Sequence, residues 1–247
     1  MNLRYIAIGL DYNTYIERDN KLRYQFQLNT RFISNYLSKE VRKIKFQTDG
    51  TFNMITIALT EDKLKETDIV PIDVLQTYLP FDRNKYEKIR GTDDCQYYIE
   101  LFQKGFVKAS KFKKLPLESL LEILRNFEDG GCKNEWLHKT KKFKEQNLEI
   151  KLVCDFNTNF FQLTAIINQL SDKKEIFNKA IIKTEPDEVL FDKMFKDIKI
   201  ANGDIIITDK SDSPRIKISI DDLYSNNCKA EIIGNKEIKR ILSYKLS

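Results

Sequence analysis

The 247-residue chain contains a single histidine, His138, and this scarcity excludes several mechanisms. A metal site with two histidine ligands needs a residue that the sequence lacks, and so does an acid–base pair of histidines. A hydrolase with a Ser-His-Asp triad would have to use His138, but no G-x-S-x-G motif supplies its nucleophile. The sequence therefore gives no support to histidine-based catalysis.

Cysteine is also scarce, with four residues and no C-x-x-C pair: Cys95, Cys132, Cys154 and Cys228. Zinc sites usually bring two ligands close together in sequence, so this spacing does not indicate one. We expect ordinary free thiols, which are typical of a reducing compartment. The apolar stretch at residues 5–10 is too short for a signal peptide and resembles a buried strand. Together these features predict a cytoplasmic protein.

Glycine and long apolar runs are few as well. The eight glycines are scattered, and neither G-x-x-x-x-G-K-[ST] nor G-x-G-x-x-G occurs. A membrane-spanning helix needs about 20 mostly apolar residues, whereas charged residues interrupt every apolar run here. The sequence thus predicts no glycine-rich phosphate loop and no membrane association, and it indicates no cofactor and no metal.

The residues that are present predict a folded α+β protein. Sixteen Phe and 11 Tyr provide material for a core. In the first half we expect strands at 3–10 and 22–28, a helix at 29–40, and a hairpin of 43–48 with 51–59 around Asp49-Gly50. Helices are predicted at 71–79 and at 116–128; the latter carries a leucine stripe and ends at Gly130-Gly131.

The second half has a stronger strand pattern. Strands are predicted at 148–156, 160–170 and 176–184, followed by a helix that opens at Pro186 and extends through Ile198. A second hairpin is expected around Asn202-Gly203, and further strands at 216–220 and 229–233. The fold class is therefore α+β, with mainly antiparallel hairpin-built sheets and a few packed helices. We divide the chain into subdomains at 1–115 and 116–247, which share a loose pattern without a residue-level repeat.

The favoured functional hypothesis is a non-catalytic protein-binding module, such as an inhibitor, an immunity protein or an adaptor. Residues 184–222 contain ten acidic and six basic residues, so this segment could meet a basic partner protein through complementary charge. The only Trp and the only His lie in a predicted loop after the helix at 116–128, where aromatic residues often anchor a partner. The candidate protein-binding residues are Trp136, His138, Asp187, Glu188, Asp192, Asp209 and Asp212.

Two alternatives stay open. Lysine-rich segments at 104–114 and 139–144, with aromatic residues between the lysines, could bind nucleic acid. Their candidate residues are Lys104, Lys108, Lys111, Phe112, Lys113, Lys114 and Lys142. The second alternative is a Mg²⁺-dependent nuclease of the PD-(D/E)xK type. Its motif matches are Asp187 with Asp197 and Lys199, and Asp129 with Glu149 and Lys151.

Overall fold

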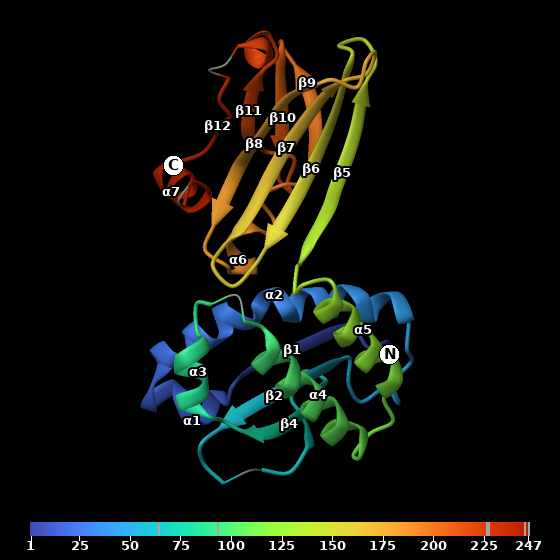
Figure 1. The fold of residues 1–247 in the computed structure, drawn as a ribbon, viewed down its shortest axis with the longest axis vertical. Helices are drawn as coiled ribbons and strands as arrows, with labels where there is room; N and C mark the ends of the chain where they lie inside the picture. The colour runs from blue at the N-terminus through green and yellow to red at the C-terminus, as the bar shows by residue number, and fades with distance from the viewer. Residues whose placement is uncertain (64, 93, 226–227, 245, 247) are drawn as a thin grey trace. The chain divides into compact units, whose positions relative to one another are not determined.

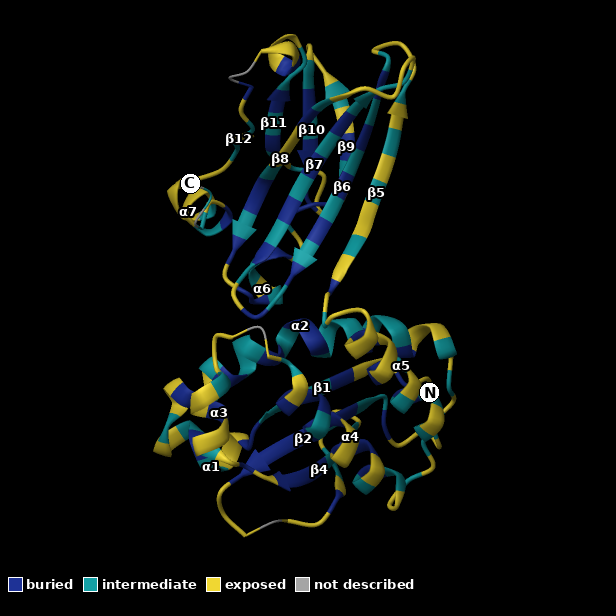
Figure 2. Cartoon of the chain, viewed as in Figure 1, coloured by how far each residue is buried: buried dark blue, intermediate teal, exposed yellow. Residues whose placement is uncertain are grey.

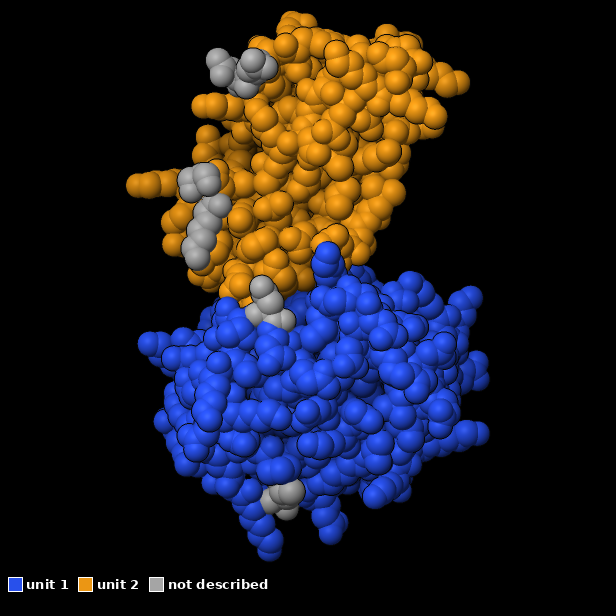
Figure 3. Space-filling view, viewed as in Figure 1, with its two compact units in different colours: residues 1–134 blue, residues 135–247 orange. Residues whose placement is uncertain are grey.

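The computed structural model describes residues 1–63, 65–92, 94–225, 228–244 and 246. The chain forms two compact units, residues 1–134 and residues 135–247 (Figures 1 and 3). The subdomains predicted at 1–115 and 116–247 stay a prediction, whereas the contacts within the chain divide it between residues 134 and 135. The helix at Leu117–Asp129 packs against two helices of the first unit, and it therefore belongs to that unit.

Unit 1 is built on a four-stranded sheet with the order β1-β2-β4-β3. Its strands are β1 (Tyr5–Leu10), β2 (Met54–Thr60), β3 (Asp68–Val70) and β4 (Val74–Pro80). The first three strands in that order are parallel, and β3 is antiparallel to β4. The central strand β2 buries nearly every side chain, which is typical of a strand covered on both faces.

Five helices accompany this sheet: α1 (Tyr12–Arg18), α2 (Asn20–Ile44), α3 (Arg83–Ile89), α4 (Gln96–Ser110) and α5 (Leu117–Asp129). The predicted helix at 116–128 corresponds to α5, whose C-cap is Gly130. The strand predicted at 22–28 is wrong, because these residues belong to the 25-residue helix α2. Leu22 and Phe26 fit a period of two, but the buried positions continue at Thr30, Ile33 and Leu37 with helical spacing.

Two further local predictions in unit 1, the hairpin around Asp49-Gly50 and the helix at 71–79, are also wrong. Asp49-Gly50 lies in the loop that joins α2 to β2, and β2 pairs in parallel with β1 and β4 rather than in a hairpin with 43–48. The predicted helix at 71–79 is the β3–β4 turn followed by β4. Ile72 and Asp73 adopt positive φ angles of 65° and 59° in that turn, which no helix tolerates.

Helix α2 covers the outer edge of the sheet, where β1 has no neighbouring strand. The Ser38 hydroxyl accepts a hydrogen bond from the Ile6 amide at 2.9 Å and lies 3.2 Å from the Ile6 carbonyl oxygen, to which it donates. One turn after Phe26, the Thr30 hydroxyl lies 3.5 Å from the Ile8 carbonyl oxygen. Ser38 thus satisfies backbone groups of Ile6 that an edge strand would otherwise leave unpaired, whereas the Thr30 hydroxyl is nearer to the Phe26 carbonyl oxygen of its own helix, at 3.0 Å.

Replacing Ser38 with alanine is expected to lower the free energy of unfolding by about 1–3 kcal/mol, because it leaves buried polar groups of Ile6 without partners. Urea denaturation measures the change. Ser34 lies on the same helix and is only half-buried, so Ser34→Ala is the matched control and should change the stability by less than about 0.5 kcal/mol. Equal losses in both variants would contradict the role of Ser38.

Helix α4 packs against the sheet at Gly105, in close contact with Ile57 of β2. A Cβ atom at Gly105 would lie 2.3 Å from Ile57 Cδ1 and 2.5 Å from Ile57 Cγ1. Ile57 is fully buried, so it has no solvent space into which it can move. The glycine therefore sets how closely α4 approaches β2.

Gly105→Ala is consequently expected to destabilise the protein by about 1–3 kcal/mol through overpacking, although alanine is about 1 kcal/mol better than glycine in a helix. The second substitution Ile57→Ala should make Gly105→Ala less costly, because it removes the clashing atoms. Gly9→Ala is the control, since a Cβ there meets no atom within 4 Å. Thermal unfolding of the single and double variants measures the coupling. Additive losses would show that the two residues do not clash.

The C-terminal end of unit 1 is bonded to two helices of the unit, α4 and α2. Cys132, in the loop after α5, forms a disulfide bond with Cys95 at the start of α4, which corrects the expectation of four free thiols. Cys154 and Cys228 are buried free thiols, as expected. The buried side chain of Asn134 donates hydrogen bonds to the Phe32 carbonyl oxygen at 2.8 Å and to Asn35 Oδ1 at 2.9 Å, both on α2.

Unit 2 contains two antiparallel four-stranded sheets, with the orders β5-β6-β7-β8 and β12-β11-β10-β9. The first sheet consists of β5 (Glu135–Phe143), β6 (Leu148–Phe156), β7 (Phe161–Gln169) and β8 (Glu175–Thr184). The second consists of β9 (Asp197–Ala201), β10 (Asp204–Thr208), β11 (Pro214–Ser219) and β12 (Glu231–Ile232). Three short helices complete the unit: α6 (Glu188–Phe191), the 3₁₀ helix η1 (Asp221–Tyr224) and α7 (Lys236–Leu242).

The strands of both sheets in unit 2 carry buried residues, which form the core of the unit (Figure 2). On β6 the burial alternates strictly, so that Leu148, Ile150 and Leu152 point inward. On β10 the buried residues are Ile205, Ile207 and Thr208. The predicted strands at 148–156, 160–170 and 176–184 and the hairpin around Asn202-Gly203 are confirmed.

The α+β class is confirmed, and two of the three sheets are antiparallel. Unit 1 departs from the hairpin-built pattern because its sheet contains three parallel strands. The two units have different strand orders and directions, so the similarity between the two halves of the sequence does not extend to their topology.

Candidate functional site

The residues predicted to bind a protein lie at one end of unit 2, which we call the α6 end. Trp136 and His138 are on β5, not in the predicted loop. Asp187 caps α6, Glu188 begins it and Asp192 follows it. Asp209 and Asp212 lie in the turn between β10 and β11. Antiparallel pairing of Thr208 with Asp197 brings that turn beside the segment that follows α6, and the Lys210 amide donates to the Lys193 carbonyl oxygen at 3.0 Å.

A stack of aromatic rings forms the base of the α6 end. The buried ring of Phe161 lies parallel to Phe191 with ring centroids 3.6 Å apart, and parallel to Phe195 with centroids 5.5 Å apart. Trp136 contacts Phe161 at 6.2 Å, and His138 meets Phe195 edge-on at 4.7 Å. These contacts hold α6 and β5 in one arrangement.

His138 is the extra residue of a β-bulge on β5, because Leu137 pairs with Val153 and Lys139 pairs with Leu152. Partial desolvation against Phe195 lowers the pKa of His138, and the nearby charges of Lys139 and Lys210 lower it further. The imidazole is therefore neutral at physiological pH and acts here as a polar aromatic group.

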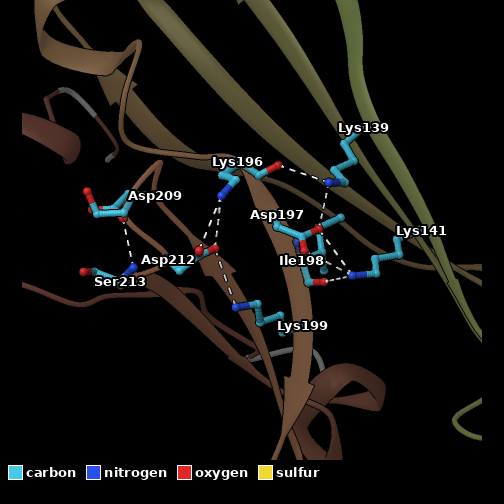
Figure 4. Close-up of polar contacts among 10 residues, drawn as sticks. Lys139, Lys141, Lys196, Asp197, Ile198, Lys199, Asp209, Asp212 and Ser213 are labelled. Carbon is cyan, nitrogen blue, oxygen red and sulfur yellow. Dashed lines mark hydrogen bonds and ion pairs between the residues drawn. The ribbon is translucent and has the colours of Figure 1, made fainter.

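Most acidic residues at the α6 end are paired with lysine or arginine of the same unit, as Figure 4 shows for Asp212. Asp192 pairs with Lys210 at 2.6 Å, and Asp212 lies 3.4 Å from Lys196 and 3.7 Å from Lys199. The buried carboxylate of Asp209 pairs with Arg215 at 2.7 Å and accepts the Ser211 and Ser213 amides. Asp192, Asp209 and Asp212 thus each have a cationic neighbour, although residues 184–222 keep their excess of ten acidic over six basic residues.

Asp197 at the start of β9 links the two sheets of unit 2. Lys139 lies 2.8 Å from its carboxylate and Lys141 lies 3.3 Å away, and the Ile198 amide also donates to it (Figure 4). The hydrogen bond from Lys139 is the main cause that holds the pKa of Asp197 well below its usual range.

A carboxyl group whose pKa falls on folding stabilises the protein above its unfolded-state pKa of about 4, and the contribution is lost as the pH falls towards the folded-state value. Asp197→Asn is therefore expected to lower the stability by about 1 kcal/mol at pH 7 and by less at pH 3. Urea denaturation at both pH values measures this. Asp204, which has one lysine at 3.6 Å, provides the control variant Asp204→Asn with a smaller loss at pH 7. If Asp197→Asn lowers the stability as much at pH 3 as at pH 7, the result would contradict a lowered pKa of Asp197.

The lysines of the nucleic-acid hypothesis do not form one free basic surface. Lys104 to Lys114 belong to unit 1 and Lys142 to unit 2. Four of the lysines make contacts within their own unit: Lys104 with Glu100, Lys108 with the Tyr78 carbonyl oxygen, Lys113 with Asp49 and Lys142 with Glu149. Lys111 and Lys114 are exposed at the end of α4, and Phe112 between them is 48% exposed.

The carboxylates of the nuclease hypothesis are also engaged elsewhere. Asp187 accepts the Val189 amide as the N-cap of α6, and Lys199 faces Asp212. In the second match, Glu149 pairs with Lys151 of its own motif at 3.1 Å, and Asp129 belongs to the other unit. Across the described ranges, no group of three or more His, Cys, Asp and Glu side chains could hold a metal ion.

Sequence reasoning missed a charged network at the carboxyl ends of the parallel strands in unit 1. Arg83 after β4 forms ion pairs with Glu61 after β2 at 3.2 Å and with Asp19 at 3.0 Å. The buried Tyr15 donates its hydroxyl to Glu61 at 2.9 Å. A pocket of about 630 Å³ opens beside this network, and α4 lines its other side with Tyr97, Glu100 and Lys104. The sequence feature that could have indicated this network is an acidic residue directly after a buried strand, as at Glu61.

Comparisons with protein-family models, with curated proteins and with solved structures gave no match. Within the described part of the chain α2 is the longest helix, and neither it nor any other has the apolar length needed to cross a bilayer.

Proposed function

We propose that the protein is a non-catalytic protein-binding module, of the inhibitor, immunity or adaptor type, and that the α6 end of unit 2 is its docking surface. One observation carries the proposal. The only Trp and the only His of the chain stand beside α6 on a rigid base of stacked phenylalanine rings. Protein interfaces concentrate their binding energy in aromatic anchors of this kind.

Exposed apolar surface at the same place supports the proposal. Val189 on α6 is 79% exposed, although its neighbours Leu190 and Phe191 are partly or fully covered. The segment that follows α6 carries ion pairs, such as the one between Asp192 and Lys210. A small apolar centre with a polar rim is the usual anatomy of a transient protein interface.

This arrangement changes the expected role of charge. The acidic residues were expected to meet a basic partner directly, but Asp192, Asp209 and Asp212 already have cationic neighbours. Paired surface charges contribute little affinity and act mainly on orientation and association rate. We therefore propose that a partner buries Val189, Trp136 and His138, and that the ion pairs orient it.

The test is affinity capture from the native host with the tagged full-length chain, followed by titration of the captured protein. Val189→Asp and His138→Ala are expected to weaken binding at least tenfold, because each disrupts the apolar centre. Ile72→Asp is the matched control, since Ile72 is 90% exposed on the β3–β4 turn of unit 1. A captured protein that binds the wild type and all three variants equally would refute the α6 end as the docking surface.

The cytoplasmic location predicted from the sequence remains part of the proposal, and the disulfide offers a test of it. Bonds of this kind persist in oxidising compartments and are rare in a reducing cytosol. Cells lysed with a thiol-blocking reagent should yield protein with Cys95 and Cys132 alkylated if the location is cytoplasmic. Protein that retains the Cys95–Cys132 bond under these conditions would contradict it.

A further inference from the structure

A second, smaller pocket lies at the opposite end of the parallel strands of unit 1, where β1 and β2 begin. Its volume is about 450 Å³, within the range of small-molecule sites. The polar lining consists of Asn2, Arg4, Arg42, Lys45 and Asn53. The pocket thus has three cationic side chains in its lining and no Asp or Glu.

These three cations differ from those of the larger pocket in unit 1. In the larger pocket, Arg83 pairs with Glu61 and Asp19, and Lys85 pairs with Glu100. Among the described residues no carboxylate forms an ion pair with Arg4, Arg42 or Lys45. All three side chains are exposed, so water screens their mutual repulsion, and a bound anion would be attracted by the three together.

Tyr5 adds an aromatic surface to the cationic group. Its ring is 42% exposed, with the Arg4 guanidinium carbon 5.8 Å from the ring centroid and that of Arg42 5.9 Å away. Guanidinium groups bind phosphate through two parallel hydrogen bonds, and an exposed tyrosine ring can stack on a nucleobase. Tyr5 is not itself part of the pocket lining, and both guanidinium groups lie over its ring. A phosphate that drew these groups towards the pocket would free the ring to stack on a flat base.

The helix dipole explains part of this cluster but not all of it. Arg42 and Lys45 lie at the C-terminal end of α2, where cations are favourable. Arg4 comes from the start of β1 and is not on that helix. Its backbone is held in place, because the Arg4 and Tyr5 amides both donate to the Asn53 carbonyl oxygen, at 2.8 Å and 3.2 Å.

We propose that this pocket binds the phosphate of a nucleotide through Arg4, Arg42 and Lys45, while the base stacks on Tyr5. The nucleotide is either free or one unit of a single-stranded nucleic acid, since both present the same chemistry. The site is in unit 1 and uses none of the residues of the α6 end.

Two probes distinguish these sources when titrated against the full-length protein at low salt: AMP, and a fluorescein-labelled single-stranded RNA of about ten nucleotides. Inorganic phosphate is the third ligand. The Arg4→Gln/Arg42→Gln double variant should weaken binding at least tenfold and reduce the salt dependence for RNA. Tyr5→Ala should weaken binding at least fivefold through lost stacking. Arg23→Gln is the matched control, because Arg23 lies 5.2 Å from the Tyr12 ring elsewhere in unit 1.

Binding of AMP with this pattern of variants supports a free nucleotide, and binding of RNA alone with the same pattern supports a single strand. The proposal is overturned if neither probe binds at low salt, or if Arg23→Gln weakens binding as much as the double variant. It is also overturned if phosphate binds as tightly as AMP or if Tyr5→Ala has no effect, because the pocket would then recognise only an anion.

Discussion

Phe161→Ala is expected to lower the free energy of unfolding by about 3–5 kcal/mol, the range for deleting a fully buried phenylalanine. The expected loss is large because Phe161 is the centre of the aromatic base at the α6 end. It stacks on Phe191 and Phe195, and Phe156 meets it edge-on with centroids 6.2 Å apart. Its removal leaves a cavity that these rings cannot fill without moving α6.

Chemical denaturation of the purified variant measures this effect, with Phe160→Ala as the matched control. Phe160 is the preceding residue and is only half-buried, with Lys183 over its ring at 4.2 Å, so its truncation should cost clearly less. Phe161→Ala is also expected to weaken partner binding, since α6 loses its support. Equal stability losses in the two variants would show that the stack contributes no more than an ordinary surface contact.

Loss of the Cys95–Cys132 bond is expected to lower the stability by about 3–4 kcal/mol, because the bond closes a loop of 37 residues and restricts the unfolded chain. The variant Cys95→Ser/Cys132→Ser should show this loss without reductant. The wild type should show it only after reduction. A reductant that destabilises the double variant as well would indicate a different cause, and a thiol assay that finds four free cysteines in the unfolded, unreduced protein would contradict the bond.

Local patterns predicted unit 2 better than unit 1. The burial pattern alternates along all of β6 and most of β7, and it is interrupted on β8. All three strands pair with their sequence neighbours, so each strand and its partner are encoded close together. In unit 1 the parallel strands β1 and β2 are joined through α1 and α2, and no local feature reports such a pairing. The sequence pattern at 22–28 fitted a strand because it covers only two turns of the 25-residue helix α2.

The candidate sites show the same contrast between contacts of sequence neighbours, which could be predicted, and long-range contacts, which could not. Trp136, Asp187 and Asp209 were selected from rarity and charge alone, and antiparallel neighbours bring them to one end of unit 2. Their ion-pair partners could not be foreseen, because Lys139 and Asp197 meet across two sheets. Arg4 and Arg42 are far apart in sequence and converge on Tyr5 only through the packing of α2 along β1. The Cys95–Cys132 pair depends on long-range packing in the same way.

The lysines of β5 have a consequence for how the protein behaves at high concentration. β5 is an edge of its sheet, and most of its residues are exposed. An unprotected edge can recruit strands from other molecules and start amyloid-like aggregation. The bulge at His138 interrupts the regular register that an added strand needs. A strand docked along β5 would also disturb the ion pairs that Lys139, Lys141 and Lys142 form with Asp197 and Glu149. We therefore expect this edge of the sheet to resist self-association.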